Sequence, residues 1–194
     1  MNTAAKAARA GDKVLSVLAI VLMVTMLAFG GYSLWDTYVT MTGAFLNRDL
    51  LKYKPSLDNP EQTRLSLEEL LKINPDTRGW ITIDGTHIDY PMVQGKDDLE
   101  YVNKEVTGEF SLSGSIFLSA YNKADFSDPY MLTYGHHMDN GGMYGDVMEY
   151  IDKDYFDKHL TGHLFMPDGR ARKMEVFAAI ECDAYDNHIY QVDG

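Results

Sequence analysis

Gly79-Trp-Ile-Thr-Ile-Asp-Gly-Thr-His-Ile-Asp-Tyr-Pro-Met-Val93 is the stretch that decides the fold. Apolar and polar residues alternate up to Asp84, which is the pattern of a half-buried β-strand. Asp84-Gly85 is a turn dipeptide of the kind that joins two antiparallel strands. The residues from Thr86 to Val93 then supply the returning strand. The stretch therefore predicts a β-hairpin at the centre of a sheet protein.

More short strands are predicted after this hairpin, separated by polar turns rich in glycine. They cover Gly114–Ser119, Tyr130–Tyr134, Thr161–Met166 and Arg172–Ile180. One or two short helices are expected over Tyr144–Leu160, and a short helix or turn over Leu99–Val106. Many short strands with a few helices indicate a mostly β fold, either an antiparallel barrel or a sandwich.

Helical patterns precede the hairpin. Residues 36–54 carry apolar side chains near helical spacing, and residues 55–60 contain two prolines typical of a linker or turn. Ser66-Leu-Glu-Glu69 is a capping box, so a short helix is expected to begin there. The helix is expected to stop at Asn74-Pro75, because the residue before a proline avoids helical backbone angles.

The chain carries no charged residue between Lys13 and Asp36. A helix that spans a bilayer needs about 20 apolar residues, so residues 14–35 are predicted to form one transmembrane helix. The residues before it include three basic ones: Lys6, Arg9 and Lys13. Basic residues stay on the cytoplasmic side of a membrane. We therefore expect a single-pass protein of the cell membrane, with its N-terminus inside and an extracytoplasmic domain.

A cleaved signal peptide is the alternative interpretation of the same segment. Ala28-Phe-Gly30 resembles the small-x-small pattern of a cleavage site. The apolar run is longer than the apolar region of a usual signal peptide, which favours an uncleaved anchor. Both interpretations place the domain outside the cytoplasm.

Charge and cysteine content restrict the partners and the compartment. The formal net charge is −12, which argues against nonspecific binding to nucleic acid because phosphates require a basic surface. Cys182 is the single cysteine of the sequence. An exported domain with one cysteine has no internal disulfide and must be held together by packing.

A pair of histidines follows the predicted strand Tyr130–Tyr134 directly after Gly135. A strand that ends at Gly-His places an imidazole at the rim of the sheet, where reacting groups are often held. Histidine transfers protons readily near neutral pH. His136 and His137 are therefore candidates for a general acid or base.

Metal binding by the histidines is the alternative. Adjacent side chains such as His136 and His137 point to opposite faces of an extended strand, so both cannot easily reach one ion. His159 and His163 have the spacing of a helical metal pair, but Gly162 is expected to end that helix. We expect no metal site and no cofactor.

Four stretches match one protein family together, in this order and at compatible spacing. They are Asn74-Pro-Asp-Thr-Arg-Gly-Trp-Ile81, Ile88-Asp-Tyr-Pro-Met-Val-Gln-Gly95, Gly114-Ser-Ile-Phe-Leu118 and Thr133-Tyr-Gly-His-His-Met138. The sequence resembles the class B sortases, which are membrane-anchored cysteine transpeptidases of Gram-positive bacteria. The resemblance begins near residue 66 and implies a sortase-like β-barrel with N-terminal helices.

The expected organisation combines the anchor with this resemblance. Residues 1–13 would form a cytoplasmic tail, residues 14–35 the transmembrane anchor, and residues 36–65 a linker with a helix. Residues 66–194 would form the sortase-like domain, incomplete at its C-terminus.

The resemblance also implies a reaction. A cysteine thiolate attacks the carbonyl of a threonine in the C-terminal sorting signal of a surface protein. An amine of a peptidoglycan precursor or of a pilin then resolves the acyl-enzyme. The histidine of the family directly follows a glycine and corresponds to His136, whose imidazole can protonate the leaving amine.

Residues for the sorting-signal groove follow from the resemblance as well. Asp98 and Val102 correspond to positions on one wall of the groove. Ile189 and Tyr190 fall in a region that corresponds to part of the opposite wall. Ordinary packing in the barrel is the alternative role for Val102 and Ile189.

The sequence departs from the family at the nucleophile. The family carries its cysteine in a Thr-Leu-x-Thr-Cys strand and an arginine on the next strand, and no Thr-Cys pair occurs here. Cys182 follows His136 too closely for the family's order and is expected to be a packing or surface residue. We therefore expect an inactive N-terminal fragment of a transpeptidase. The alternatives are a degenerate, non-catalytic exported module that binds peptides or assembles pili, and an unrelated membrane-tethered β-domain.

Overall fold

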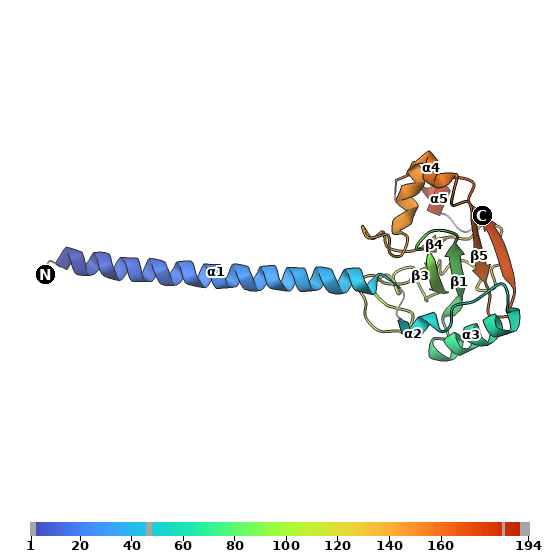
Figure 1. The fold of residues 1–194 in the computed structure, drawn as a ribbon, viewed down its shortest axis with the longest axis horizontal. Helices are drawn as coiled ribbons and strands as arrows, with labels where there is room; N and C mark the ends of the chain where they lie inside the picture. Colours follow the sequence, from blue (N-terminus) through green and yellow to red (C-terminus); the bar gives the residue numbers. More distant parts are fainter. Residues whose placement is uncertain (1–2, 46–47, 184, 191–194) are drawn as a thin grey trace. The chain divides into compact units, whose positions relative to one another are not determined.

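The computed structural model describes residues 3–45, 48–183 and 185–190, and the chain divides into two compact units, Met1–Val39 and Thr40–Gly194 (Figure 1). The first unit consists of most of helix α1 (Thr3–Gly43). By length and composition, Ala5–Gly43 is apolar enough to cross a membrane. The predicted anchor at residues 14–35 lies inside this helix, while its orientation in a membrane stays a prediction.

The helical pattern over residues 36–54 corresponds to helix in two parts, the end of α1 and the short helix α2 (Arg48–Leu51). Helix α1 continues without interruption to Gly43, and α2 follows. Residues 36–43 contain one glycine, at the very end, and no proline, so nothing in the backbone stops the anchor helix at its last apolar residue.

A six-stranded sheet forms the second unit, in the order β4-β3-β2-β1-β5-β6. The predicted hairpin lies at its centre. Strands β1 (Thr77–Ile83) and β2 (Asp89–Val93) are antiparallel, with Trp80 opposite Pro91. The turn between them places Gly85 at a φ of +76°, a backbone conformation that favours glycine. The local turn chemistry therefore predicted the hairpin correctly.

The remaining strands extend the sheet on both sides. They are β3 (Ile116–Leu118), β4 (Thr133–Tyr134), β5 (Thr161–Phe165) and β6 (Ala171–Glu175). Strand β5 pairs with β1, β6 with β5, and β4 with β3, all antiparallel. Strand β3 runs parallel to β2. The mostly antiparallel sheet is confirmed for the part of the chain that the structure describes.

The strand predicted over Tyr130–Tyr134 is shorter than expected and is not fully buried. The side chain of Asn122 donates to the Tyr130 carbonyl at 2.8 Å and accepts from the Leu132 backbone N–H at 2.9 Å. An asparagine can satisfy a backbone donor and an acceptor at once. It therefore replaces ladder hydrogen bonds along this segment, and only Thr133–Tyr134 pairs as a strand.

The strand expected over Arg172–Ile180 is also shorter, since β6 ends at Glu175. Its last ladder partner is Thr161, the first residue of β5. Val176 donates one more hydrogen bond, to the Leu160 carbonyl at 2.8 Å. Beyond that point β5 offers no further backbone to pair with, so the chain leaves the sheet.

The helix before the hairpin begins earlier than predicted. Helix α3 spans Pro60–Ile73, and Asn59 caps it by accepting from the Gln62 backbone N–H at 3.0 Å. Asparagine as the cap followed by proline at the first helical position is a strong start signal. Ser66 of the supposed capping box is buried inside the helix. The predicted end is confirmed, with Asn74 as the C-terminal cap.

The segment after the glycine-rich loop forms two short helices, as expected. They are the 3-10 helix η1 (Gly145–Ile151) and α4 (Lys153–Phe156), and a third short helix, α5 (Asn187–Tyr190), lies near the end of the chain. Residues 99–106 form turns and not a helix.

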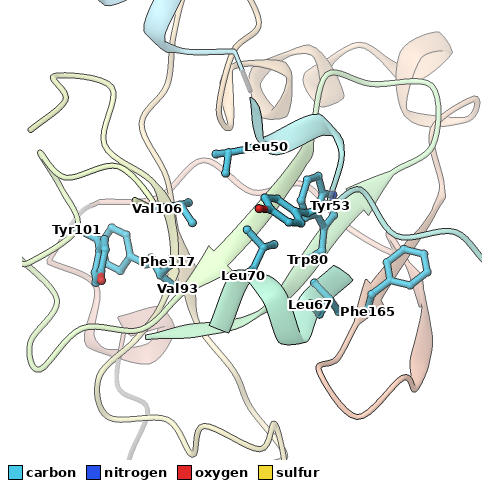
Figure 2. Close-up of a cluster of buried hydrophobic side chains, with 10 residues drawn as sticks. All are labelled: Leu50, Tyr53, Leu67, Leu70, Trp80, Val93, Tyr101, Val106, Phe117 and Phe165. Carbon is cyan, nitrogen blue, oxygen red and sulfur yellow. The ribbon is translucent and has the colours of Figure 1, made fainter. Parts of the chain in front are cut away.

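Apolar side chains cover both faces of the sheet. Figure 2 shows one cluster, in which Trp80 packs with Leu50 of α2, with Leu67 and Leu70 of α3, and with residues from strands and connections: Tyr53, Val93, Tyr101, Val106, Phe117 and Phe165. Ile81 belongs to a second cluster that includes Met92, Phe126 and Met143. Because successive strand residues point to opposite faces, a sheet covered on both sides buries both Trp80 and Ile81.

Replacing Tyr90 with phenylalanine is expected to lower the free energy of unfolding by about 1–3 kcal/mol. The buried Tyr90 hydroxyl donates to the Ala44 carbonyl at 3.0 Å and accepts from the Met143 backbone N–H at 2.9 Å. Phenylalanine leaves both backbone groups without this partner. Urea unfolding of the full chain in detergent micelles measures the loss. Tyr121, which is 76% exposed, is the control, and an equal loss for Tyr121→Phe would contradict the assignment.

Candidate active site

Gly135 determines where His136 lies at the end of β4. A Cβ atom at this position would lie 2.3 Å from Ile116 Cδ1 and 2.9 Å from the ring of Tyr144. Glycine therefore lets the end of β4 pack directly against these two side chains. The backbone N–H of Tyr144 donates to the His136 carbonyl at 2.9 Å. This hydrogen bond also holds the backbone of the histidine in place.

The His136 ring is partly buried and makes one specific hydrogen bond. Its Nε2 lies 2.8 Å from the backbone carbonyl oxygen of Val102. A carbonyl oxygen can only accept, so Nε2 is the donor and carries a hydrogen. His137 is exposed and lines a different pocket, together with His87 and Asp146. The structure thus separates the two adjacent histidines.

A pocket of about 670 Å³ brings the sequence-predicted site residues together. His136, Asp98, Val102, Ile189 and Tyr190 all line it. The remaining lining is mostly apolar or aromatic: Phe117, Tyr130, Leu132, Thr133, Tyr134, Gly135, Tyr144, Phe177, Ala178, Ile180 and Cys182. Apolar pockets with a few directed polar groups are the usual form of ligand sites.

Asp98 provides a carboxylate that the protein holds in place. It accepts hydrogen bonds from the Ala120 backbone N–H at 2.6 Å and from the Ser119 hydroxyl at 3.1 Å. Burial, followed by the nearby Asp98 carboxylate, raises the pKa of Tyr134 to about 12. Tyr134 lines the same pocket and keeps its proton well above neutral pH.

Two tyrosines contact the segment that lines the opposite wall of the pocket. The Tyr130 hydroxyl donates to the Ile189 carbonyl at 2.7 Å, which links the β3–β4 connection to α5. The Tyr190 hydroxyl lies 3.9 Å from the sulfur of Cys182. The sequence pattern places Tyr130 in a strand and gives no reason to count it among the site residues. Nothing in the sequence around Tyr130 indicates its contact with the distant Ile189.

Cys182 is exposed and lines the same pocket as His136, while its expected role as a packing or surface residue stays a prediction. Among the described residues, no arginine lines this pocket. Arg172 instead donates to the Phe126 carbonyl at 2.8 Å, on the far strand β6. Within the described ranges, no three His, Cys, Asp or Glu side chains lie close enough to hold a metal ion.

The chain is similar to known proteins over most of its length. It is 30% identical to sortase B of Staphylococcus aureus over 178 residues, which is 90% of this chain and 72% of that protein. It is 40% identical to sortase B of Listeria monocytogenes over 100 residues, which is 52% of this chain and 41% of that protein. No family model matches the chain.

Solved structures show the same similarity. A Streptococcus pyogenes class B sortase involved in pilus biogenesis is 42% identical, with a TM-score of 0.60 over 64% of this chain and 76% of that chain. The Staphylococcus aureus sortase B–substrate complex is 26% identical, with a TM-score of 0.60 over 73% of this chain and 70% of that chain. The curled sheet is therefore the half-barrel of the sortase fold. By sequence and by fold, the chain belongs to the class B sortases, a family of cysteine transpeptidases.

Proposed function

We propose that this chain forms the sorting-signal groove and supplies the general acid of a sortase-type transpeptidase. The substrate would be a surface protein with a C-terminal sorting signal, and the acceptor an amine of a peptidoglycan precursor or a pilin. The observation that supports this is the pocket that His136 shares with Asp98, Val102, Ile189 and Tyr190. A Staphylococcus aureus relative has been solved as a sortase B–substrate complex, which supports a substrate-binding role for this pocket.

The chemistry assigned to His136 is proton transfer. When a cysteine thiolate attacks the threonine carbonyl, the peptide bond after that threonine breaks and the leaving amine needs a proton. The imidazolium of His136 can provide it, and the neutral ring can take a proton from the incoming amine. General acid–base catalysis of this kind contributes a factor of about 10²–10⁴ to a rate.

The walls of the pocket suit an extended peptide. Val102 and Ile189 offer apolar surface from two segments distant in the sequence, and Asp98 offers a fixed carboxylate that can accept from peptide N–H groups or polar side chains. The helix α1 would anchor this groove to the cell membrane through residues 14–35, with the domain on the outer side.

Peptide binding tests the groove directly. The full chain in detergent micelles is titrated against fluorescein-labelled peptides, each carrying one threonine followed by a different residue. At least one peptide is expected to bind. Ile189→Arg is expected to weaken it by 10-fold or more, because a cation replaces apolar contact area in the groove. Tyr185→Arg is the matched control, since Tyr185 lies on the same segment, is 91% exposed and does not line the pocket.

Two results would contradict this assignment. One is that no peptide of the panel binds, and the other is that Ile189→Arg and Tyr185→Arg leave the affinity equally unchanged. Cleavage of the bound peptide is followed in the same samples. We expect no cleavage, because the sequence lacks the Thr-Cys pair of the family's nucleophile strand. Cleavage that disappears in Cys182→Ala would instead assign the nucleophile to Cys182.

A non-catalytic peptide-binding or assembly module is the second candidate. The sequence without a Thr-Cys pair favours it, and so does the lack of an arginine among the described residues that line the pocket. Such a module would bind a peptide in the same groove as the first candidate, but it would have no part in cleaving the peptide. Binding without cleavage is expected of this chain for both candidates, so cleavage of a bound peptide is the result that would exclude the module.

A further inference from the structure

We infer that the Val102 backbone carbonyl and Gly114 are positioning elements that select one tautomer of His136, so that Nδ1 is the nitrogen that transfers protons. The inference rests on the proposed catalytic role of His136 and deepens it. It concerns residues that touch the histidine or its partner and not the substrate. Three observations carry it: the direction of the Val102 carbonyl, the packing of Gly114, and the bonding of the histidine ring.

The Val102 carbonyl belongs to a short segment whose neighbouring carbonyls are bound elsewhere. Ser115 donates its backbone N–H to the Tyr101 carbonyl at 3.1 Å and its hydroxyl to the Lys104 carbonyl at 2.7 Å. Ser111 donates to the Asn103 carbonyl at 3.1 Å. The carbonyl of Val102 lies between these and accepts from His136 at 2.8 Å. Hydrogen bonds therefore hold the segment in place on both sides of the Val102 carbonyl, which accepts from the imidazole.

Gly114 packs directly against this carbonyl. Its φ is +59°, and a Cβ atom there would lie 2.2 Å from the Val102 oxygen and 2.7 Å from the Tyr101 oxygen. Backbone atoms cannot move aside as the end of a flexible side chain can. A side chain at residue 114 would therefore push the Val102 carbonyl from its position. Only glycine allows the carbonyl to reach the histidine from this site.

The hydrogen bond decides which nitrogen is available for chemistry. Nε2 holds its hydrogen in the neutral ring and in the imidazolium, since its partner can only accept. No hydrogen bond joins Nδ1 to another of the described residues. Nδ1 therefore carries the lone pair of the neutral ring and the labile proton of the imidazolium. During cleavage the Nδ1–H proton passes to the leaving amine nitrogen, and the ring is left neutral with its hydrogen on Nε2.

The tautomer is measured by nitrogen-15 NMR of the histidine rings in the full chain, held in detergent micelles at a pH where the ring is neutral. The His136 signals are identified by their loss in His136→Gln. The wild-type chain is expected to show His136 with its hydrogen on Nε2. Gly114→Ala is expected to shift the ring toward a mixture of both tautomers.

Gly108→Ala is the matched control. Gly108 also has a positive φ, +93°, but a Cβ atom there would meet only the end of the Lys104 side chain at 3.9 Å. Both variants impose backbone strain on the same loop, and only Gly114→Ala displaces the carbonyl. Equal tautomer shifts in the two variants, or an unchanged ring in a folded Gly114→Ala, would overturn the inference.

The wild-type spectrum tests the inference even where Gly114→Ala fails to fold, because a hydrogen on Nδ1 of the neutral ring would refute it. The result is independent of the proposed function. A chain that binds no peptide but shows the Nε2–H tautomer refutes the groove and leaves the positioning intact. A chain that binds a peptide but carries the hydrogen of the neutral ring on Nδ1 refutes the positioning and leaves the groove intact.

Discussion

Replacing Trp80 with alanine is expected to lower the free energy of unfolding by about 3–5 kcal/mol, the range for truncating a buried tryptophan. Trp80 is 0% exposed and lies in the cluster shown in Figure 2, between the sheet and helix α3. Its indole N–H donates to Asp89 at 2.7 Å, so alanine also removes a partner from that carboxylate. The cavity and the lost hydrogen bond both lower the free energy of unfolding.

Urea unfolding of the full chain in detergent micelles, followed by circular dichroism, measures this loss. Trp35, the other tryptophan of the chain, is 65% exposed and lies in helix α1, so Trp35→Ala is the control. It is expected to change the unfolding of the sheet by less than about 0.5 kcal/mol, as is usual for exposed positions. A loss below about 1 kcal/mol for Trp80→Ala would show that this cluster is not the centre of the core.

Alkaline pH is expected to destabilise the folded chain steeply between about pH 10 and 12. Burial raises the pKa of four tyrosines to about 12: Tyr101, Tyr134, Tyr144 and Tyr150. An unfolded tyrosine loses its proton near pH 10. Between these values the native state holds more protons than the unfolded state, so raising the pH favours unfolding. The stability is fully present below pH 10 and is lost as the pH rises toward 12.

The free energy of unfolding, measured at several pH values from 8 to 11.5, tests this dependence. One tyrosine of this kind contributes a slope of about −1.4 kcal/mol per pH unit inside the window. Tyr144→Phe is expected to flatten the slope by up to that amount, because phenylalanine cannot titrate. The exposed Tyr121→Phe should leave the slope unchanged. A slope that Tyr144→Phe does not alter would contradict the assignment to buried tyrosines.

Local patterns predicted the elements whose structure depends on neighbouring residues. The hairpin around Gly85, the end of α3 at Asn74 and the two short helices after the glycine-rich loop were all expected. The start of α3 was missed although it also had a local signal. Asn59 followed by Pro60 is a stronger cap than the Ser66 capping box, and the prolines were assigned to a linker.

The candidate site was predicted through the family resemblance and not through the residue pattern. The pattern placed a histidine at the rim of a sheet, and the resemblance selected His136 and the four residues proposed for the groove, which all line one pocket. Neither the residue pattern nor the resemblance predicted Tyr130 as a site residue. The hydrogen bond from its hydroxyl to the Ile189 carbonyl joins residues far apart in the sequence, and its own backbone carbonyl accepts from Asn122.

The sequence alone determined the membrane-compatible helix, the central hairpin and the glycine of its turn, Gly85. These features depend on composition, on period and on the φ angles that single residues tolerate, which are local properties. The tertiary structure alone decided that His136 meets the Val102 carbonyl and that Asn122 ends a predicted strand. Such contacts form only when the whole sheet brings distant segments together, and no local pattern records which backbone oxygen a side chain will reach.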